Sequence, residues 1–171
     1  RNPYDPSDIV GTVTASATAD IENALANAKP WSADAETRAA TLQKASELYE
    51  RHYGVFLALA AREAGKTLPD AVSELREAVD FLRYYGEQAS QLTEPACGTI
   101  ACISPWNFPL AIFTGQIAGA LAAGNAVIAK PAEQTPLIAA QAVALLHQAG
   151  VPRDVLQLLP GGGRTVGAAL S

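Results

Sequence analysis

Methionine is absent from the 171 residues, and cysteine is scarce, with only two. Because translated chains start with methionine, its absence and the Arg at position 1 favour both ends being cuts through a longer protein, with trimmed disordered termini as the alternative. Long apolar runs are also lacking, since the stretch over residues 117–129 is too short to span a bilayer and contains two glycines and an asparagine. With no signal peptide visible either, we expect a cytoplasmic protein.

A basic surface is the next feature that the sequence lacks. The net charge is −5, which argues against a nucleic-acid or membrane-surface role, because both usually need a basic face. Hydrophobic residues make up 49% and charged residues 17%, an ordinary globular composition. The length is sufficient for one domain with a sizeable core.

Metal-binding and disulfide patterns are missing as well. Cys97 and Cys102 fall on one predicted strand, roughly 16 Å apart in an extended chain, which is too far for a disulfide. We expect both to be small buried hydrophobic residues in a reducing compartment. His52 and His147 have no Cys, Asp or Glu at ligand spacing, so both are expected to be ordinary helix residues, and no metal site is predicted.

Charged residues are unevenly distributed along the chain. Residues 95–171 carry only five, which predicts that this part is mostly buried or packed against something else. Residues 1–94 are charge-rich and form a mainly helical lead-in, with a strand expected over 9–14 and helices over 20–28, 35–64 (broken or bent at Gly54) and from Pro69. In the last helix Val72, Leu75, Val79 and Leu82 share the face expected to pack on the core, with Glu74 off it.

Strands and helices alternate in the second part. Strands are predicted over 98–104 (buried), 125–129 and 155–159, and helices over 109–123, over 135–149 and after Gly163. This order implies βαβ units with right-handed crossovers and a parallel sheet. The predicted fold class is therefore α/β: a three-layer Rossmann-like parallel sheet with the N-terminal helices packed on it. Ligands of such sheets bind at the carboxyl ends of the strands.

Three unusual segments fall at that edge of the sheet, and the first is Ser104–Pro109. Pro105 and Pro109 fix the backbone on both sides of Asn107. A side-chain amide held in this way can donate to an oxygen that gains negative charge. The alternative is that Asn107 caps the helix that begins near Pro109 and that Trp106 and Phe108 belong to the core.

The second segment is Lys130–Pro136. Lys130 is the only lysine after residue 66, and it ends a buried strand, so its stem can lie on apolar surface while the ammonium emerges. The Glu133 carboxylate can accept from ribose hydroxyls and would repel a 2′-phosphate. The alternative is a local ion pair between Lys130 and Glu133 that caps the next helix.

The third segment is Pro160–Gly167. Its G-x-G-x-x-x-G pattern is one residue longer than the usual dinucleotide fingerprint and follows the third strand rather than the first. Glycines still allow close backbone approach, and a helix N-terminus favours anions. A plain tight turn is the alternative.

Together the motifs PWNFP (105–109), KPAEQTP (130–136) and PGGG (160–163) with Gly167 resemble the aldehyde dehydrogenase superfamily, and the resemblance covers nearly the whole chain. Residues 76–85 and 103–116 resemble the 1-pyrroline-5-carboxylate (glutamate semialdehyde) dehydrogenase module of bifunctional proline-catabolic enzymes of the proline utilisation A type. The resemblance implies that residues 1–171 are the N-terminal part of an NAD-binding domain, with 95–171 as its βαβαβ cofactor-binding unit.

The resemblance also implies a chemistry and a set of site residues. In the family a Cys thiolate attacks the aldehyde, NAD takes the hydride, and a Glu activates the hydrolytic water. Asn107 matches the residue that stabilises the oxyanion. Lys130 and Glu133 match the positions that hold the adenine ribose. Further cofactor contacts match Ile103, Ser104, Pro105, Trp106, Ala132, Gly163 and Gly167.

Two departures from the family pattern limit what the chain is expected to do alone. The nucleophilic Cys and the general-base Glu lie downstream of all three motifs, and Cys97 and Cys102 match neither, so the chain by itself is expected to be inactive. The segment over 89–97 is short where many relatives insert a β-hairpin used in subunit contacts, which puts the usual oligomer in doubt.

The partners implied are an aldehyde substrate, NAD, the catalytic remainder of the same polypeptide and a homo-oligomer, with no membrane or nucleic acid. The alternatives are a dehydrogenase of another aldehyde, or a non-catalytic interaction module of the same fold.

Overall fold

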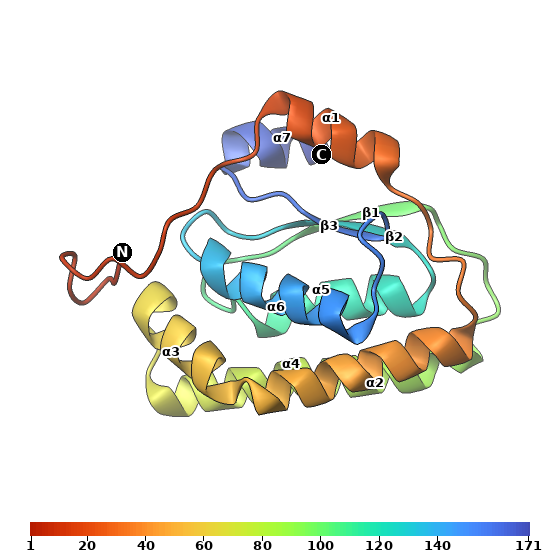
Figure 1. Cartoon of the computed structure of the whole chain (residues 1–171), viewed down its shortest axis with the longest axis horizontal. Coiled ribbons are helices and arrows are strands. Elements are labelled where there is room, and N and C mark those ends of the chain that lie inside the picture. Colours follow the sequence, from red (N-terminus) through yellow and green to blue (C-terminus); the bar gives the residue numbers. More distant parts are fainter.

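The helices that open the chain begin and end where the sequence supplies caps. The computed structural model describes residues 1–171 and has α1 at Thr18–Asn27, α2 at Ala35–Arg51, α3 at Tyr53–Ala64 and α4 at Leu68–Gln88 (Figure 1). Asp34 caps α2 by accepting from the Thr37 N–H at 2.7 Å. Gly65 ends α3 in the left-handed region, at φ 67°. The predicted cap and stop are confirmed, but the break between α2 and α3 falls at His52 rather than at Gly54.

The second half of the chain forms a parallel sheet. Its strands are β1 (Thr99–Ile103), β2 (Ala126–Lys130) and β3 (Leu156–Leu158), in the spatial order β1-β2-β3. They are joined by α5 (Ala111–Ala122) and α6 (Pro136–Ala149), and followed by a π-helical turn, η2 (Gly163–Gly167), and the short α7 (Ala168–Leu170). All three strands therefore end at one edge of the sheet, and the predicted α/β fold class is confirmed.

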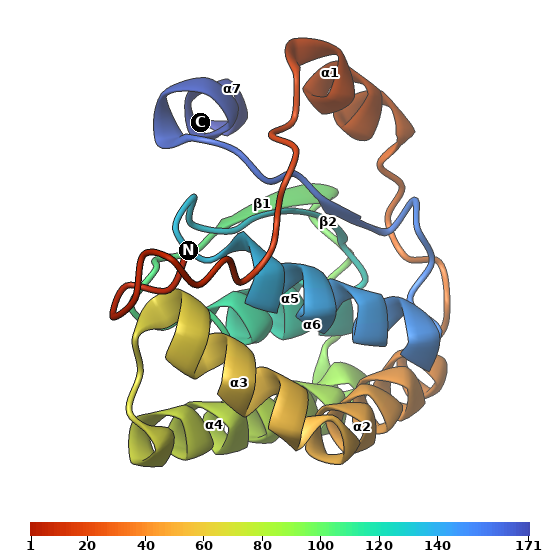
Figure 2. The same ribbon diagram turned by 60° about the vertical axis from the view of Figure 1, so that its left-hand side comes forward.

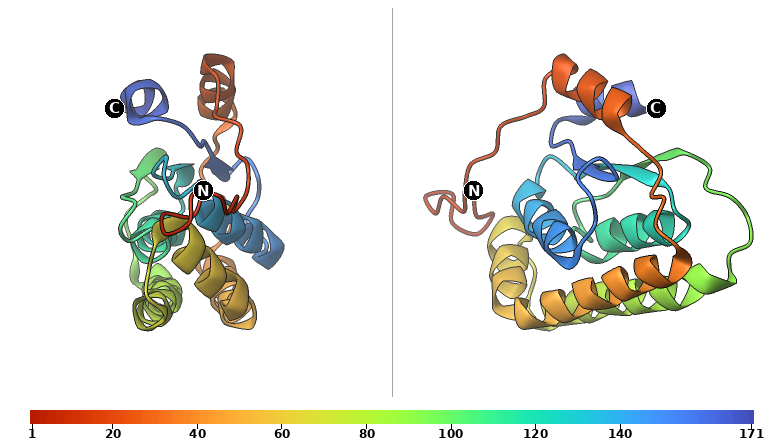
Figure 3. Two further views of the ribbon diagram at one scale, coloured as in Figure 1. Left: turned by 90° about the vertical axis from the view of Figure 1, so that its left-hand side faces the viewer. Right: turned by 45° about the vertical axis from the view of Figure 1, so that its right-hand side comes forward.

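The sheet lies between two helical layers, and a third helical layer lies beyond one of them. Helices α5 and α6 cover one face of the sheet, and α1 and α7 lie over the other (Figures 1 and 3). Helices α2 and α4 pack on the outer side of α5 and α6 rather than on the sheet itself (Figure 2). The expected direct packing of the lead-in helices on the sheet is thus wrong for these two helices.

The core is divided by the sheet because side chains alternate between its faces. Val127 and Ala129 of β2 face a large cluster that α2, α4, α5 and α6 share. Ile128 faces a small cluster, formed with Ile21 and Ala24 of α1 and with Leu159 and Val166. Every residue of β2 is buried, which is typical of a central strand covered on both faces.

Three expectations about individual elements are corrected. Strand β1 is largely exposed, because it is an edge strand of this sheet. On α4, Val72 is 41% exposed whereas Glu74 is 3% exposed, so the buried face is rotated toward Glu74. Cys97, which precedes β1, is exposed.

The strand expected over residues 9–14 does not form, and residues 1–16 are an irregular arm. The Arg62 guanidinium donates to both carboxylate oxygens of Asp8, with an Nε–Oδ2 distance of 3.0 Å. That hydrogen bond, with a second from Asn2, lowers the pKa of Asp8 to about 2. The arm's backbone makes one hydrogen bond to the end of β3, from Ser16 N–H to the Pro160 carbonyl at 2.8 Å, too little for a fourth strand.

The connection from α4 to β1 contains one 3-10 turn, η1 (Ala89–Gln91), and no β-hairpin. No helix is long and apolar enough to cross a membrane.

Candidate cofactor and active site

The first loop at the strand ends leaves the sheet at Ser104, whose N–H donates to the Lys130 carbonyl at 3.2 Å. Ser104 is buried, and its hydroxyl has no hydrogen-bond partner, whereas Trp106 and Asn107 are exposed. Asn107 does not cap α5, because the first N–H groups of that helix donate to Glu74 instead. The capping alternative for Asn107 is therefore wrong.

Lys130 begins the second loop in an unexpected environment. The side chain is buried, at 4% exposure, and its ammonium donates to the carbonyl of Pro131 at 2.7 Å rather than emerging into solvent. Burial lowers the pKa of Lys130, and the nearby negative charge of Glu133 opposes this shift. Only one of the three ammonium N–H groups has a hydrogen-bond acceptor within the protein.

Glu133 is exposed and forms no ion pair with Lys130. Nor does it cap α6, since Glu63 of α3 accepts from the N–H groups of Leu137 (2.8 Å) and Ile138 (2.9 Å). The local ion pair that competed with the ribose hypothesis is therefore not formed. Glu133 is left with a free carboxylate at the edge of the sheet.

The third loop packs directly against the second, and its glycines make this possible. A Cβ on Gly162 would lie 3.0 Å from a carboxylate oxygen of Glu133, and one on Gly167 would lie 3.5 Å from the Lys130 Cε. Gly163 has open space around it. None of the three has a positive φ, so backbone strain explains none of them, and close approach accounts for the glycine only at position 162. The segment is a π-helical turn that leads directly into α7, so the helix predicted after Gly163 is confirmed and the plain tight turn is wrong.

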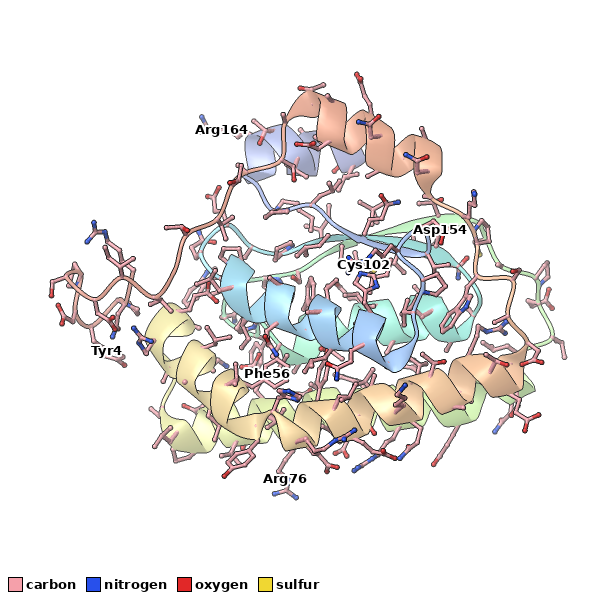
Figure 4. The ribbon with its side chains drawn as sticks, in the orientation of Figure 1. Tyr4, Phe56, Arg76, Cys102, Asp154 and Arg164 are labelled. Atoms are coloured by element: carbon pink, nitrogen blue, oxygen red, sulfur yellow. The ribbon has the colours of Figure 1, made fainter.

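The three loops thus form one connected site. The first is joined to the second through the sheet, where Ile103 pairs with Lys130, and the second meets the third at Glu133–Gly162 and Lys130–Gly167. Arg164 is exposed and projects away from the molecule (Figure 4), so it leaves the glycine surface uncovered. The remaining predicted contact residues, Pro105 and Ala132, are partly exposed at the same edge.

Three charged residues of the lead-in take part in this site and escaped the sequence argument. The Glu74 Oε1 atom accepts from the N–H groups of Leu110 (2.7 Å) and Ala111 (3.1 Å), and Glu63 plays the same role for α6. Lys66 forms an ion pair with Glu74 at 2.8 Å. Glu74 falls on the buried face of α4 between Ala71 and Ala78, and a carboxylate at such a position needs a partner, which is the signal that could have revealed it.

Neither cysteine is placed for nucleophilic attack. Cys102 is enclosed within the sheet (Figure 4), and burial raises the pKa of its thiol to about 11. Cys97 precedes the amino end of β1, at the opposite edge of the sheet from Asn107. Both histidines make local hydrogen bonds at helix ends: His52 Nδ1 bonds the Leu48 carbonyl, and His147 Nδ1 bonds the Val151 carbonyl.

Comparison with known proteins shows to which family a chain with this strand-end site belongs. The sequence model of the aldehyde dehydrogenase family matches residues 1–171. The chain belongs to this family. It is 55% identical over 179 aligned residues to the bifunctional protein PutA of Klebsiella aerogenes, and 37% identical over 188 to the 1-pyrroline-5-carboxylate dehydrogenase of Anoxybacillus flavithermus. These matches cover 99% and 97% of this chain but only 14% and 36% of the two relatives.

Solved structures superimpose on nearly all of this chain. The 1-pyrroline-5-carboxylate dehydrogenase from Thermus with bound NAD matches with a TM-score of 0.91 and 36% identity, covering 99% of this chain and 37% of that one. A crystal structure of bifunctional proline utilization A matches with a TM-score of 0.87 and 46% identity, covering 93% and 18%. The chain thus spans well under half of the length of these relatives.

Proposed function

We propose that this chain is the first part of the NAD-binding domain of a longer NAD-dependent aldehyde dehydrogenase. Its substrate in this proposal is glutamate semialdehyde, formed from 1-pyrroline-5-carboxylate, and its product is glutamate. The observation that carries the proposal is the meeting of Lys130, Glu133 and the glycine turn at the strand ends, in a chain whose relatives are named for 1-pyrroline-5-carboxylate oxidation.

The residues present fit NAD. The Ser104 hydroxyl is buried without a partner, the glycine turn offers open backbone at Gly163, and the carboxylate of Glu133 is free. Lys130 and Glu133 would hold the hydroxyls of the adenine ribose, and Glu133 would disfavour a 2′-phosphate by charge repulsion. The residues proposed to line the cofactor are Ile103, Ser104, Pro105, Trp106, Ala132, Gly163 and Gly167. When bound, NAD supplies the acceptor for the hydride.

Asn107 is the residue of this chain proposed to act on the substrate. Its amide N–H would donate to the aldehyde oxygen as that oxygen gains negative charge, and removing such a donor typically costs about 100-fold to 1000-fold in kcat. We propose that the nucleophilic thiolate and the general base come from the remainder of the polypeptide, because Cys102 is buried and Cys97 lies at the other edge. The chain alone is then expected to be inactive and to bind NAD weakly at most.

The test compares the complete polypeptide with residues 1–171. NADH formation is followed with 1-pyrroline-5-carboxylate and, as a matched competitor, propionaldehyde, and NAD binding is measured by calorimetry. We expect turnover only in the complete polypeptide, with the higher kcat/KM for 1-pyrroline-5-carboxylate, and loss of roughly 100-fold in the Asn107→Ala variant. Turnover by residues 1–171 that Cys102→Ala abolishes would instead identify Cys102 as the nucleophile and overturn the proposal.

A further inference from the structure

Two charged residues, one just before α4 and one within it, contact the chain on the carboxyl-terminal side of Asn107. Lys66, in the turn between α3 and α4, places its ammonium 4.3 Å from the centre of the Phe108 ring. Glu74, two turns into α4, accepts from the N–H groups of Leu110 and Ala111. Since Lys66 and Glu74 are themselves joined at 2.8 Å, the loop is held by a single charged unit.

The burial of this pair makes it more than a surface contact. The side chains of Lys66 and Glu74 are 13% and 2% exposed. A buried carboxylate is tolerated when its oxygens are paired, and here one oxygen accepts from two backbone N–H groups at a helix N-terminus while the other faces the ammonium. The ammonium in turn lies over an aromatic ring, a position that favours a cation. Removing either partner leaves the other as an uncompensated charge.

The Asn107 side chain is not itself held by the protein, although Pro105 and Pro109 restrict φ in the backbone on either side of it. This side chain is exposed and makes no hydrogen bond within the protein, so its position depends on the backbone on either side. On the amino-terminal side the sheet fixes Ser104 through its bond to Lys130. On the carboxyl-terminal side the contacts that fix the backbone are those of Phe108, Leu110 and Ala111 with the charged pair.

We propose that Lys66 and Glu74 are positioning residues for Asn107, an inference that rests on the proposed function of the Asn107 amide. Neither residue touches the reacting atoms. Their effect is to hold the amide where the oxyanion forms, and errors of about 1 Å in such placement can cost up to 100-fold in rate. Because the sheet anchors the cofactor side of the loop independently, the effect falls on kcat more than on NAD affinity.

The variants are made in the complete polypeptide. Glu74→Gln keeps the shape and one acceptor but removes the charge, and Lys66→Met removes the cation. Lys66→Arg keeps both the ion pair and the ring contact, so it should rescue the function. Thr67→Ala is the matched control: it removes the N-cap of the same helix, where the Thr67 hydroxyl accepts from the Asp70 N–H, without touching the loop.

Three readouts are combined: kcat, the Kd for NAD, and hydrogen exchange of the Leu110 and Ala111 amides by peptide-level mass spectrometry. We expect Glu74→Gln and Lys66→Met to lower kcat by roughly 10-fold to 100-fold with the Kd for NAD changed less than about threefold. Exchange at Leu110 and Ala111 should be faster in both variants. Lys66→Arg and Thr67→Ala should stay within about threefold of the parent in kcat.

The outcomes separate this inference from the proposed function. Unchanged exchange at Leu110 and Ala111 in Glu74→Gln overturns the inference, whatever the enzyme's substrate. Faster exchange with unchanged kcat overturns the positioning role. If the parent polypeptide oxidises no aldehyde, the proposed function fails. Hydrogen exchange at Leu110 and Ala111, together with the Kd for NAD, then still shows whether Lys66 and Glu74 hold the loop. A loss of kcat in Thr67→Ala equal to that in Glu74→Gln would show general destabilisation and would also overturn the inference.

Discussion

Iodoacetamide should label Cys97 more than 100-fold faster than Cys102. Cys102 is 3% exposed, inside β1, whereas Cys97 is exposed in the segment before that strand. Only the thiolate reacts, and burial raises the pKa of Cys102 to about 11 from an ordinary value of 9.0. At pH 8 this leaves about 0.1% of Cys102 as thiolate, against about 10% for an ordinary thiol.

The hundredfold difference is a lower limit, because the reagent must also reach the buried sulfur. The assay follows the labelling of each cysteine separately by peptide mass spectrometry in the complete polypeptide, so that other cysteines do not interfere. The rate at Cys102 should rise about tenfold for each pH unit and should level off only as the pH approaches 11, since the neutral thiol predominates below that value.

Two results would refute this reasoning. One is comparable labelling of Cys97 and Cys102 at pH 8. The other is a Cys102 rate that levels off near pH 7, because a thiol ionised at that pH would be a competent nucleophile. The Cys97→Ser variant serves as a control and checks that labelling at Cys102 does not depend on modification of Cys97.

Three further predictions concern the strand-end loops and the N-terminal arm. Glu133→Gln should weaken NAD binding by roughly 3-fold to 10-fold and reduce the preference over NADP, as measured by calorimetry with both cofactors; equal NAD affinity in the parent and variant would contradict the ribose role. Gly161→Ala should lower the Tm, because its Cβ would lie 2.4 Å from Val166, whereas Gly163→Ala should leave the Tm unchanged and weaken NAD binding; equal Tm values would show that the turn can relax. The arm held by Asp8 should resist proteolysis above pH 4 and become susceptible as the pH falls toward 2. The reason is that a carboxylate whose pKa is lowered by folding stabilises the folded state at pH values above its pKa in the unfolded chain, and this stabilisation is lost when the carboxylate is protonated. The Asp8→Asn variant should already be cleaved rapidly at pH 7.

The parallel sheet and the edge that carries the site could be predicted because they depend on local signals. Apolar strands alternating with helices imply right-handed βαβ units, and these units bring the segments after Ile103, Lys130 and Leu158 to one edge. Helix boundaries at Asp34 and Gly65 follow from cap chemistry, which also acts within a few residues.

Burial and pairing were less predictable because they depend on neighbours distant in sequence. The residues of β1 suit a buried strand as well as an edge strand, and only the strand order shows that it is exposed. Residues 9–14 have a strand-like sequence, but Gly11 lies beside the Leu137 side chain at the start of α6, and the arm meets the end of the sheet only at the Ser16–Pro160 hydrogen bond.

The partners of the site residues were unpredictable for the same reason, even where the sequence marks a buried carboxylate. Glu74 lies 36 residues from Leu110, and Glu63 lies 74 residues from Leu137, so no local pattern links either carboxylate to the helix it caps. A periodicity argument places a charged residue on the solvent face unless its partner is known. The approach of Glu133 to Gly162 likewise becomes visible only once the second and third loops are folded together.

The two helix-capping carboxylates have a consequence for how the chain can be divided. Helices α5 and α6 both begin on side chains supplied by α4 and α3, and one apolar cluster joins α2 and α4 to the sheet. The change of composition near Pro95 therefore does not mark a boundary between two independently folding domains. Residues 95–171 produced separately would carry uncapped N–H groups at Leu110, Ala111, Leu137 and Ile138 and an uncovered helical face. We therefore expect residues 1–94 and 95–171 to unfold as a single cooperative body.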